Sequence, residues 1–157
     1  MKGFWKFIIA VIGCEIVGLI STPFTISAIP AWYAHLNKPF FAPPNWLFGP
    51  AWTTLYFLMG LAAFIVWQKG TKTKKVKEAL SYFLLQLLFN FVWSIFFFGL
   101  RSPILGLIDI LIMLLAINLT IISFNKVSKI ASYIMIPYVL WVTFATILNL
   151  AIVLLNR

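Results

Sequence analysis

Aromatic and amide side chains recur in this sequence at spacings that place them on one face of a helix. One apolar segment carries them at i, i+4, i+7 and i+11, namely Gln86, Asn90, Trp93 and Phe97. Two other segments repeat the pattern, with Trp52, Tyr56 and Met59 in one and Tyr138, Trp141, Ala145 and Leu148 in the other. Indole faces and amides that converge inside a bundle suit a flat aromatic ligand. The alternative is a packed core held by hydrogen bonds between helices.

Residues for conventional catalysis are scarce. The chain has one histidine, His35, one cysteine, Cys14, and three acidic residues, and we find no His–carboxylate pair, metal-binding cluster or phosphate-binding loop. Ligation of haem by two histidines of one chain is therefore excluded. The sequence predicts no metal site and no required cofactor. Any catalysis would depend on the chemistry of a bound ligand, so whether the protein is an enzyme stays open.

The composition indicates an integral membrane protein. The chain is 63% hydrophobic and 10% charged, with a mean hydropathy of +1.04, whereas a soluble domain carries about 25% charged residues. The net charge of +9 would suggest a nucleic-acid partner in a soluble protein. Here the basic residues flank apolar segments, which indicates membrane topology, and no nucleic-acid partner is expected.

The apolar runs predict an all-α fold in which residues 1–157 form one bundle of five transmembrane helices. Each run approaches the ~20 residues needed to cross a bilayer, and continuous rather than alternating apolar sequence excludes a barrel. The predicted spans are Phe4–Ile20, Ala51–Trp67, Ala79–Leu100, Ile104–Phe124 and Ala131–Leu155.

Residues 21–50 form the longest predicted connection, between the first two spans. Six of the eight prolines lie there: Pro23, Pro30, Pro39, Pro43, Pro44 and Pro50. Each proline ring fixes its own φ and biases the preceding residue toward extended geometry. We therefore predict a structured, proline-rich loop that acts as a lid over the bundle.

The distribution of cations predicts the orientation in the bilayer. Five spans place nine cations on the side of the N-terminus: Lys2, Lys6, Lys69, Lys72, Lys74, Lys75, Lys77, Lys126 and Lys129. The other side carries Lys38, Arg101 and Arg157. Because cytoplasmic loops are enriched in Lys and Arg, we predict a cytoplasmic N-terminus and an external C-terminus.

Two carboxylates fall within predicted spans, where ionisable groups cost at least ~2.5–3.5 kcal/mol on insertion scales. Glu15 is either a hydrogen-bonded packing residue or a functional one. Asp109 is near the start of its span, close to Arg101 and Ser102. It is either a capped or interfacial carboxylate or a functional one.

Several stretches together resemble one known family. They are WYAHLNKP (Trp32–Pro39), PPNWLFGPAWTTLYFLMG (Pro43–Gly60), Val66-Trp67, Gln86-Leu87, Asn90, Trp93, Phe97–Gly99, Asp109 and PYVLWVTFATILN (Pro137–Asn149). In combination, order and spacing they resemble the translocator protein family, also called tryptophan-rich sensory proteins or peripheral benzodiazepine receptors. The resemblance covers nearly the whole chain, and the chain is similar to the bacterial members.

The resemblance implies a five-helix membrane fold, commonly a homodimer, whose first loop covers a ligand cavity. Members of the family bind porphyrins such as protoporphyrin IX, and some bacterial members are associated with light- and oxygen-dependent porphyrin breakdown. By position, Trp52 and Trp141 are the implied cavity tryptophans and the candidates for a catalytic role. The other implied ligand-binding residues are Trp32, Tyr56, Asn90, Trp93, Ala145 and Leu148.

The family's cholesterol-recognition pattern is absent, since Leu150 and Ala151 stand where its aromatic residue would fall. No sterol site is predicted. The leading hypothesis is a tetrapyrrole-binding sensor or scavenger in a bacterial cytoplasmic membrane, with porphyrin as ligand or substrate. The alternatives are a transporter of tetrapyrroles or other amphipathic molecules, and a membrane interaction protein whose ligand stabilises a dimer.

Overall fold

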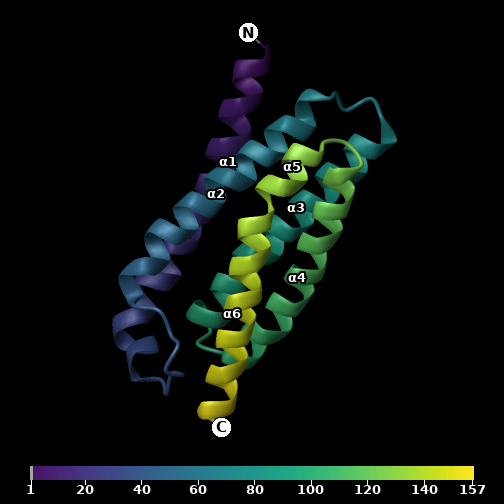
Figure 1. The fold of residues 1–157 in the computed structure, drawn as a ribbon. Coiled ribbons are helices and arrows are strands. Elements are labelled where there is room, and N and C mark those ends of the chain that lie inside the picture. The colour runs from purple at the N-terminus through teal and green to yellow at the C-terminus, as the bar shows by residue number, and fades with distance from the viewer. Residues whose placement is uncertain (1) are drawn as a thin grey trace.

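Backbone N–H and C=O groups inside a bilayer find no water for hydrogen bonding. Apolar segments of this length therefore form helices, in which these groups bond to one another. The computed structural model describes residues 2–157 and contains five helical segments long and apolar enough to cross a membrane. They are α1 (Lys2–Ala31), α2 (Asn45–Gln68), α3 (Lys74–Ser94) with the π-helical turn η2 (Ile95–Gly99), α4 (Pro103–Asn125), and α5 (Lys129–Ile134) with α6 (Ile136–Leu155). The predicted five-span, all-α fold is confirmed, and the chain ends lie at opposite ends of the bundle (Figure 1).

The predicted boundaries of the first connection are wrong. Helix α1 continues through Pro23 and Pro30 to Ala31, and α2 begins at Asn45 and includes Pro50. A proline removes one backbone hydrogen bond, whereas ending a helix within the bilayer would leave several backbone groups unpaired. The connection is therefore residues 32–44 rather than 21–50, and only half of the six prolines lie in it.

Residues 32–44 are fastened to the C-terminal end of α6. The Asn37 backbone N–H donates to Asn156 Oδ1 (3.0 Å), and Asn156 Nδ2 donates to the Asn37 carbonyl (2.9 Å). A third bond joins Asn37 Nδ2 to the Leu155 carbonyl (3.3 Å). Within the connection, the 3₁₀ turn η1 (Tyr33–His35) precedes Lys38, whose Nζ donates to the Tyr33 carbonyl (3.1 Å). These bonds order the connection at that end of the bundle.

Helices α1 and α2 touch closely toward the N-terminal end of α1. A Cβ atom at Gly60 would lie 2.6 Å from Val11 Cα and 2.9 Å from the Ala10 carbonyl oxygen, so the two backbones are in contact there. Lys6 Nζ also donates to the Trp67 carbonyl (3.2 Å) and lies over the Trp67 ring. Farther along, toward Asn45, a cavity lies between the same two helices.

Candidate functional site

The larger cavity has a volume of about 420 Å³ and lies among α1, α2 and α3. Its α1 lining is Glu15, Gly18, Leu19, Ser21, Thr22, Thr25, Ile26 and Ile29. The α2 lining is Asn45, Trp46, Phe48, Gly49, Trp52, Thr53 and Tyr56. Asn90, Trp93 and Ser94 of α3, with Phe98 of η2, complete the wall. This volume falls within the ~300–1,000 Å³ typical of small-molecule sites.

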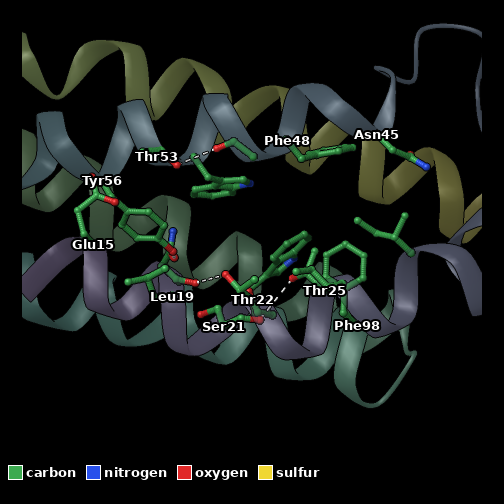
Figure 2. Close-up of a pocket in the computed structure, with 18 of the residues that line it drawn as sticks. Glu15, Leu19, Ser21, Thr22, Thr25, Asn45, Phe48, Thr53, Tyr56 and Phe98 are labelled. Atoms are coloured by element: carbon green, nitrogen blue, oxygen red, sulfur yellow. Dashed lines mark hydrogen bonds between the residues drawn. The ribbon is translucent and has the colours of Figure 1, made fainter.

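The cavity is elongated along the helices. Glu15 and Tyr56 lie at one end and Asn45 lies at the other (Figure 2). At 1.5 Å per residue, the lining from Glu15 to Ile29 spans about 21 Å. Leu19 and Trp46 line the cavity and are also exposed. The cavity therefore reaches the outer surface of the bundle between α1 and α2, where a ligand can enter from the membrane.

A second, smaller cavity of about 30 Å³ adjoins the first and is lined by residues of η1, α2, α3, η2 and α6. Its lining residues are Tyr33, Phe48, Trp52, Trp93, Phe97, Phe98, Trp141, Ala145, Leu148, Asn149 and Ile152. Phe48, Trp52, Trp93 and Phe98 line both cavities. Four aromatic side chains thus form the wall between the two cavities.

Two hydrogen-bond donors that line the smaller cavity lack partners. Trp141 Nε1 and the Tyr33 hydroxyl are buried, and neither has a hydrogen-bond partner in the described chain. Burial raises the pKa of Tyr33, so its hydroxyl stays protonated at physiological pH. An unpaired buried donor costs ~1–3 kcal/mol. The smaller cavity therefore favours an occupant that presents hydrogen-bond acceptors.

A buried hydrogen-bond network connects the larger cavity to the core. The Tyr56 hydroxyl donates to Asn90 Oδ1, and Asn90 Nδ2 donates to the Tyr138 hydroxyl (3.0 Å). Tyr138 in turn donates to Gln86 Oε1 (2.8 Å). Asn90, Tyr138 and Gln86 are at most 2% exposed. The network joins α2, α3 and α6, and it fixes the Tyr56 ring at the end of the cavity.

Trp93 is held by a second set of bonds. Its Nε1 donates to Asn149 Oδ1 (3.3 Å), and Asn149 Nδ2 donates to the Pro103 carbonyl (2.8 Å). The Trp93 ring also stacks on Phe97, with 5.0 Å between ring centroids. These contacts fix the orientation of the Trp93 ring in the wall between the two cavities.

The structure brings together seven of the eight predicted ligand-binding residues, divided between the two cavities. Trp52 and Trp93 line both, Tyr56 and Asn90 line the larger, and Trp141, Ala145 and Leu148 line the smaller. Trp32 lines neither, and packs edge-on against Phe97 at 5.5 Å. Its neighbour Tyr33 lines the smaller cavity instead. Ligand binding by these residues stays a prediction.

Two parts of the lining were not predicted from the sequence, namely α1 beyond Ile20 and the first turns of α2. Both lie within the predicted loop 21–50, for which no helical faces were expected. Phe48 precedes Trp52 by four residues and shares its face. Thr22, Thr25 and Ile29 follow Glu15 at helical spacing along α1. This helical periodicity was the signal in the sequence from which these lining residues could have been predicted.

The two carboxylates within spans have different environments. Glu15 lines the larger cavity and is partly exposed. Asp109 is only 2% exposed, and the N-cap of α4 is Ser102, whose hydroxyl accepts from Leu105 N–H (3.3 Å). The Asp109 carboxyl group therefore lies among the helices of the bundle, and Ser102 rather than Asp109 caps α4.

Comparison with known proteins finds one family over nearly the whole chain. Residues 10–155 match the model of the TspO/MBR family. The chain is 45% identical over 152 residues to the tryptophan-rich protein TspO of Archaeoglobus fulgidus, covering 96% of this chain and 97% of that protein. It is 42% identical over 143 residues to the protein of the same name from Chlorobaculum tepidum, covering 91% and 90% of the two chains. It is 39% identical over 119 residues to the human translocator protein, covering 75% and 70%.

Proposed function

Because the chain belongs to the TspO/MBR family and forms an integral membrane bundle of five spans, we propose that it binds porphyrins of the protoporphyrin IX type, as a sensor or scavenger. The observation that carries the proposal is the wall of Trp52, Trp93, Phe48 and Phe98 between the two cavities. A porphyrin is a broad π-surface, and indole and phenyl faces bind such surfaces by stacking. The volume of the larger cavity supports a ligand of this class.

The polar groups around the site support one orientation of the ring. The acidic edge of the porphyrin presents hydrogen-bond acceptors, which suit the unpartnered Trp141 Nε1 and Tyr33 hydroxyl. Glu15 lies at the end of the larger cavity away from Asn45 (Figure 2), and its carboxylate would repel a porphyrin carboxylate placed there. The proposed pose therefore directs the acidic edge toward the smaller cavity, with Phe48 or Phe98 displaced to admit it.

Replacing Trp52 or Trp141 with phenylalanine is expected to weaken protoporphyrin IX binding about 2- to 10-fold. Each change removes part of an aromatic contact worth ~0.5–1.5 kcal/mol, and the Trp141 change also removes a donor. The measurement is a titration of porphyrin absorbance with the purified protein, so that loss of a tryptophan does not alter the signal. Trp5→Phe is the matched control, because Trp5 is exposed at the start of α1. Equal affinities for all four proteins would contradict the proposal.

The same samples test whether binding leads to degradation. Trp52 and Trp141 both line the smaller cavity, and indoles beside a photosensitising ring are candidates to react with it or with species it generates. We propose that illumination in air bleaches bound porphyrin faster than free porphyrin in detergent, and that Trp52→Phe or Trp141→Phe slows this bleaching. Equal bleaching of bound and free ligand would leave a binding protein without this activity.

We propose that the N-terminus is cytoplasmic, because the N-terminal side of the five spans carries nine cations and the other side three. Thr71 lies in the connection between α2 and α3, and Phe40 is fully exposed in residues 32–44. A membrane-impermeant maleimide should label Phe40→Cys in intact cells, and Thr71→Cys only after permeabilisation. The native Cys14 is buried, so the parent protein supplies the background. If only Thr71→Cys were labelled in intact cells, the N-terminus would lie outside the cell and the proposed orientation would be wrong.

A further inference from the structure

The described lining of the larger cavity contains a carboxyl group and no cationic side chain. Glu15 is the one charged residue in its lining among residues 2–157, and neither Lys38 nor His35 contributes to it. Lys38 instead donates to the Tyr33 carbonyl and lies over the Tyr33 ring. A carboxylate in a membrane-embedded cavity is costly unless an occupant compensates its charge.

The Ser and Thr hydroxyl groups that α1 and α2 contribute to the same cavity are available only as acceptors. Ser21 Oγ donates to the Val17 carbonyl (2.8 Å) and Thr22 Oγ1 to the Gly18 carbonyl (2.9 Å). Thr25 and Thr53 likewise donate to carbonyls of their own helices. Since each hydroxyl has a single proton, the lone pairs of these oxygens are what remains for a ligand.

Next to Glu15, the Tyr56 hydroxyl has also used its only donor, and Asn90 has used one of its two amide protons. Tyr56, which shares the Glu15 end of the cavity (Figure 2), donates its hydroxyl proton to Asn90. Asn90 donates an amide proton to Tyr138. The Glu15 end therefore presents a carboxyl group and mainly acceptor oxygens, in contrast to the smaller cavity with its unpaired donors.

We propose that the larger cavity is a site for amphiphiles with a protonated amine, in which the ammonium group binds Glu15 and the apolar body lies along Trp52 toward Asn45. The inference rests on the proposed use of this cavity for flat aromatic ligands, and it adds a ligand class selected by charge. An ammonium group supplies the positive charge that this end lacks and donors for its acceptor oxygens. The opening between α1 and α2 admits such a molecule from the membrane.

Three porphyrins that share one ring and carry differently charged substituents on one edge test the proposal. They are protoporphyrin IX, its neutral dimethyl ester, and its diamide with ethylenediamine, which carries two protonated amines. Binding is measured by porphyrin absorbance with the protein in nanodiscs of zwitterionic phosphatidylcholine, where the bilayer itself has no net charge. The wild-type protein should bind the diamide about tenfold more tightly than the ester.

Glu15→Gln should remove this preference, weakening diamide binding about tenfold while leaving ester binding within about twofold. Glu78→Gln is the matched control, because Glu78 is exposed near the start of α3 and the change alters net charge equally. If Glu15→Gln weakened the binding of all three porphyrins equally, Glu15 would have a structural role and the inference would be overturned. Ester and diamide binding that is equal in the wild type would overturn it as well. Failure of protoporphyrin IX to bind would reject the proposed porphyrin site, whereas failure of the diamide alone to bind would overturn only this inference.

Discussion

Gly60→Ala is expected to lower the stability of the protein by about 1–3 kcal/mol, the usual cost of overpacking. The added Cβ would lie 2.6 Å from Val11 Cα and 2.9 Å from the Ala10 carbonyl oxygen. Both are backbone atoms, so no side-chain rotation can relieve the clash, and α1 must move away from α2. A thermal-unfolding scan of the purified protein measures the change, at ~2–4 °C per kcal/mol for a chain of this size.

Gly13→Ala is the matched control for this change. Gly13 is also helical, within α1, but a Cβ there would meet no atom within 4 Å. Alanine is favoured over glycine in a helix interior by about 1 kcal/mol, so this variant should be as stable as the parent or slightly more so. Because the cavity lies between α1 and α2, Gly60→Ala should also weaken porphyrin binding. Equal stability of the two variants would show that the helices do not meet at Gly60.

The number and type of spans could be predicted because hydropathy and length determine them directly. The C-terminal boundary of the first span could not be predicted, because Pro23 and Pro30 are strong helix-ending signals in water and weak ones in a bilayer. Similarly, the fifth span is broken at Met135, just before Pro137, although its sequence is apolar throughout. Prolines in membrane segments thus require tertiary context before they can be interpreted.

The aromatic part of the site could be predicted from helical periodicity and family resemblance together. Its division into two cavities could not, because that depends on the rotamers of Phe48 and Phe98. The role of Glu15 in the lining also required the neighbouring helices, since an isolated carboxylate in a span has no defined environment in sequence. Homodimer formation stays a prediction from the resemblance.

Asn90→Leu is expected to lower stability by about 1–3 kcal/mol and to weaken porphyrin binding. Leucine has a similar volume but cannot accept from Tyr56 or donate to Tyr138. Hydrogen bonds between helices in membranes average about 0.6 kcal/mol, while a buried hydroxyl left without a partner costs ~1–3 kcal/mol. The second effect dominates, because Asn90 is 2% exposed and water cannot readily replace it. A freed Tyr56 ring would also move within the cavity it lines.

A double-mutant cycle separates the hydrogen bond from the loss of the amide itself. In a Tyr56→Phe background the unpaired hydroxyl no longer exists, so Asn90→Leu should cost clearly less than it does in the parent. Thermal unfolding of the four proteins measures the coupling. Asn118→Leu is the control, since Asn118 is exposed on α4 and bonds only to the Leu114 carbonyl of its own helix (2.8 Å). Additive costs in the cycle would mean that the Tyr56–Asn90 bond does not stabilise the bundle, and that Tyr56 is held in the cavity wall by packing against neighbours such as Gly18 and Trp52.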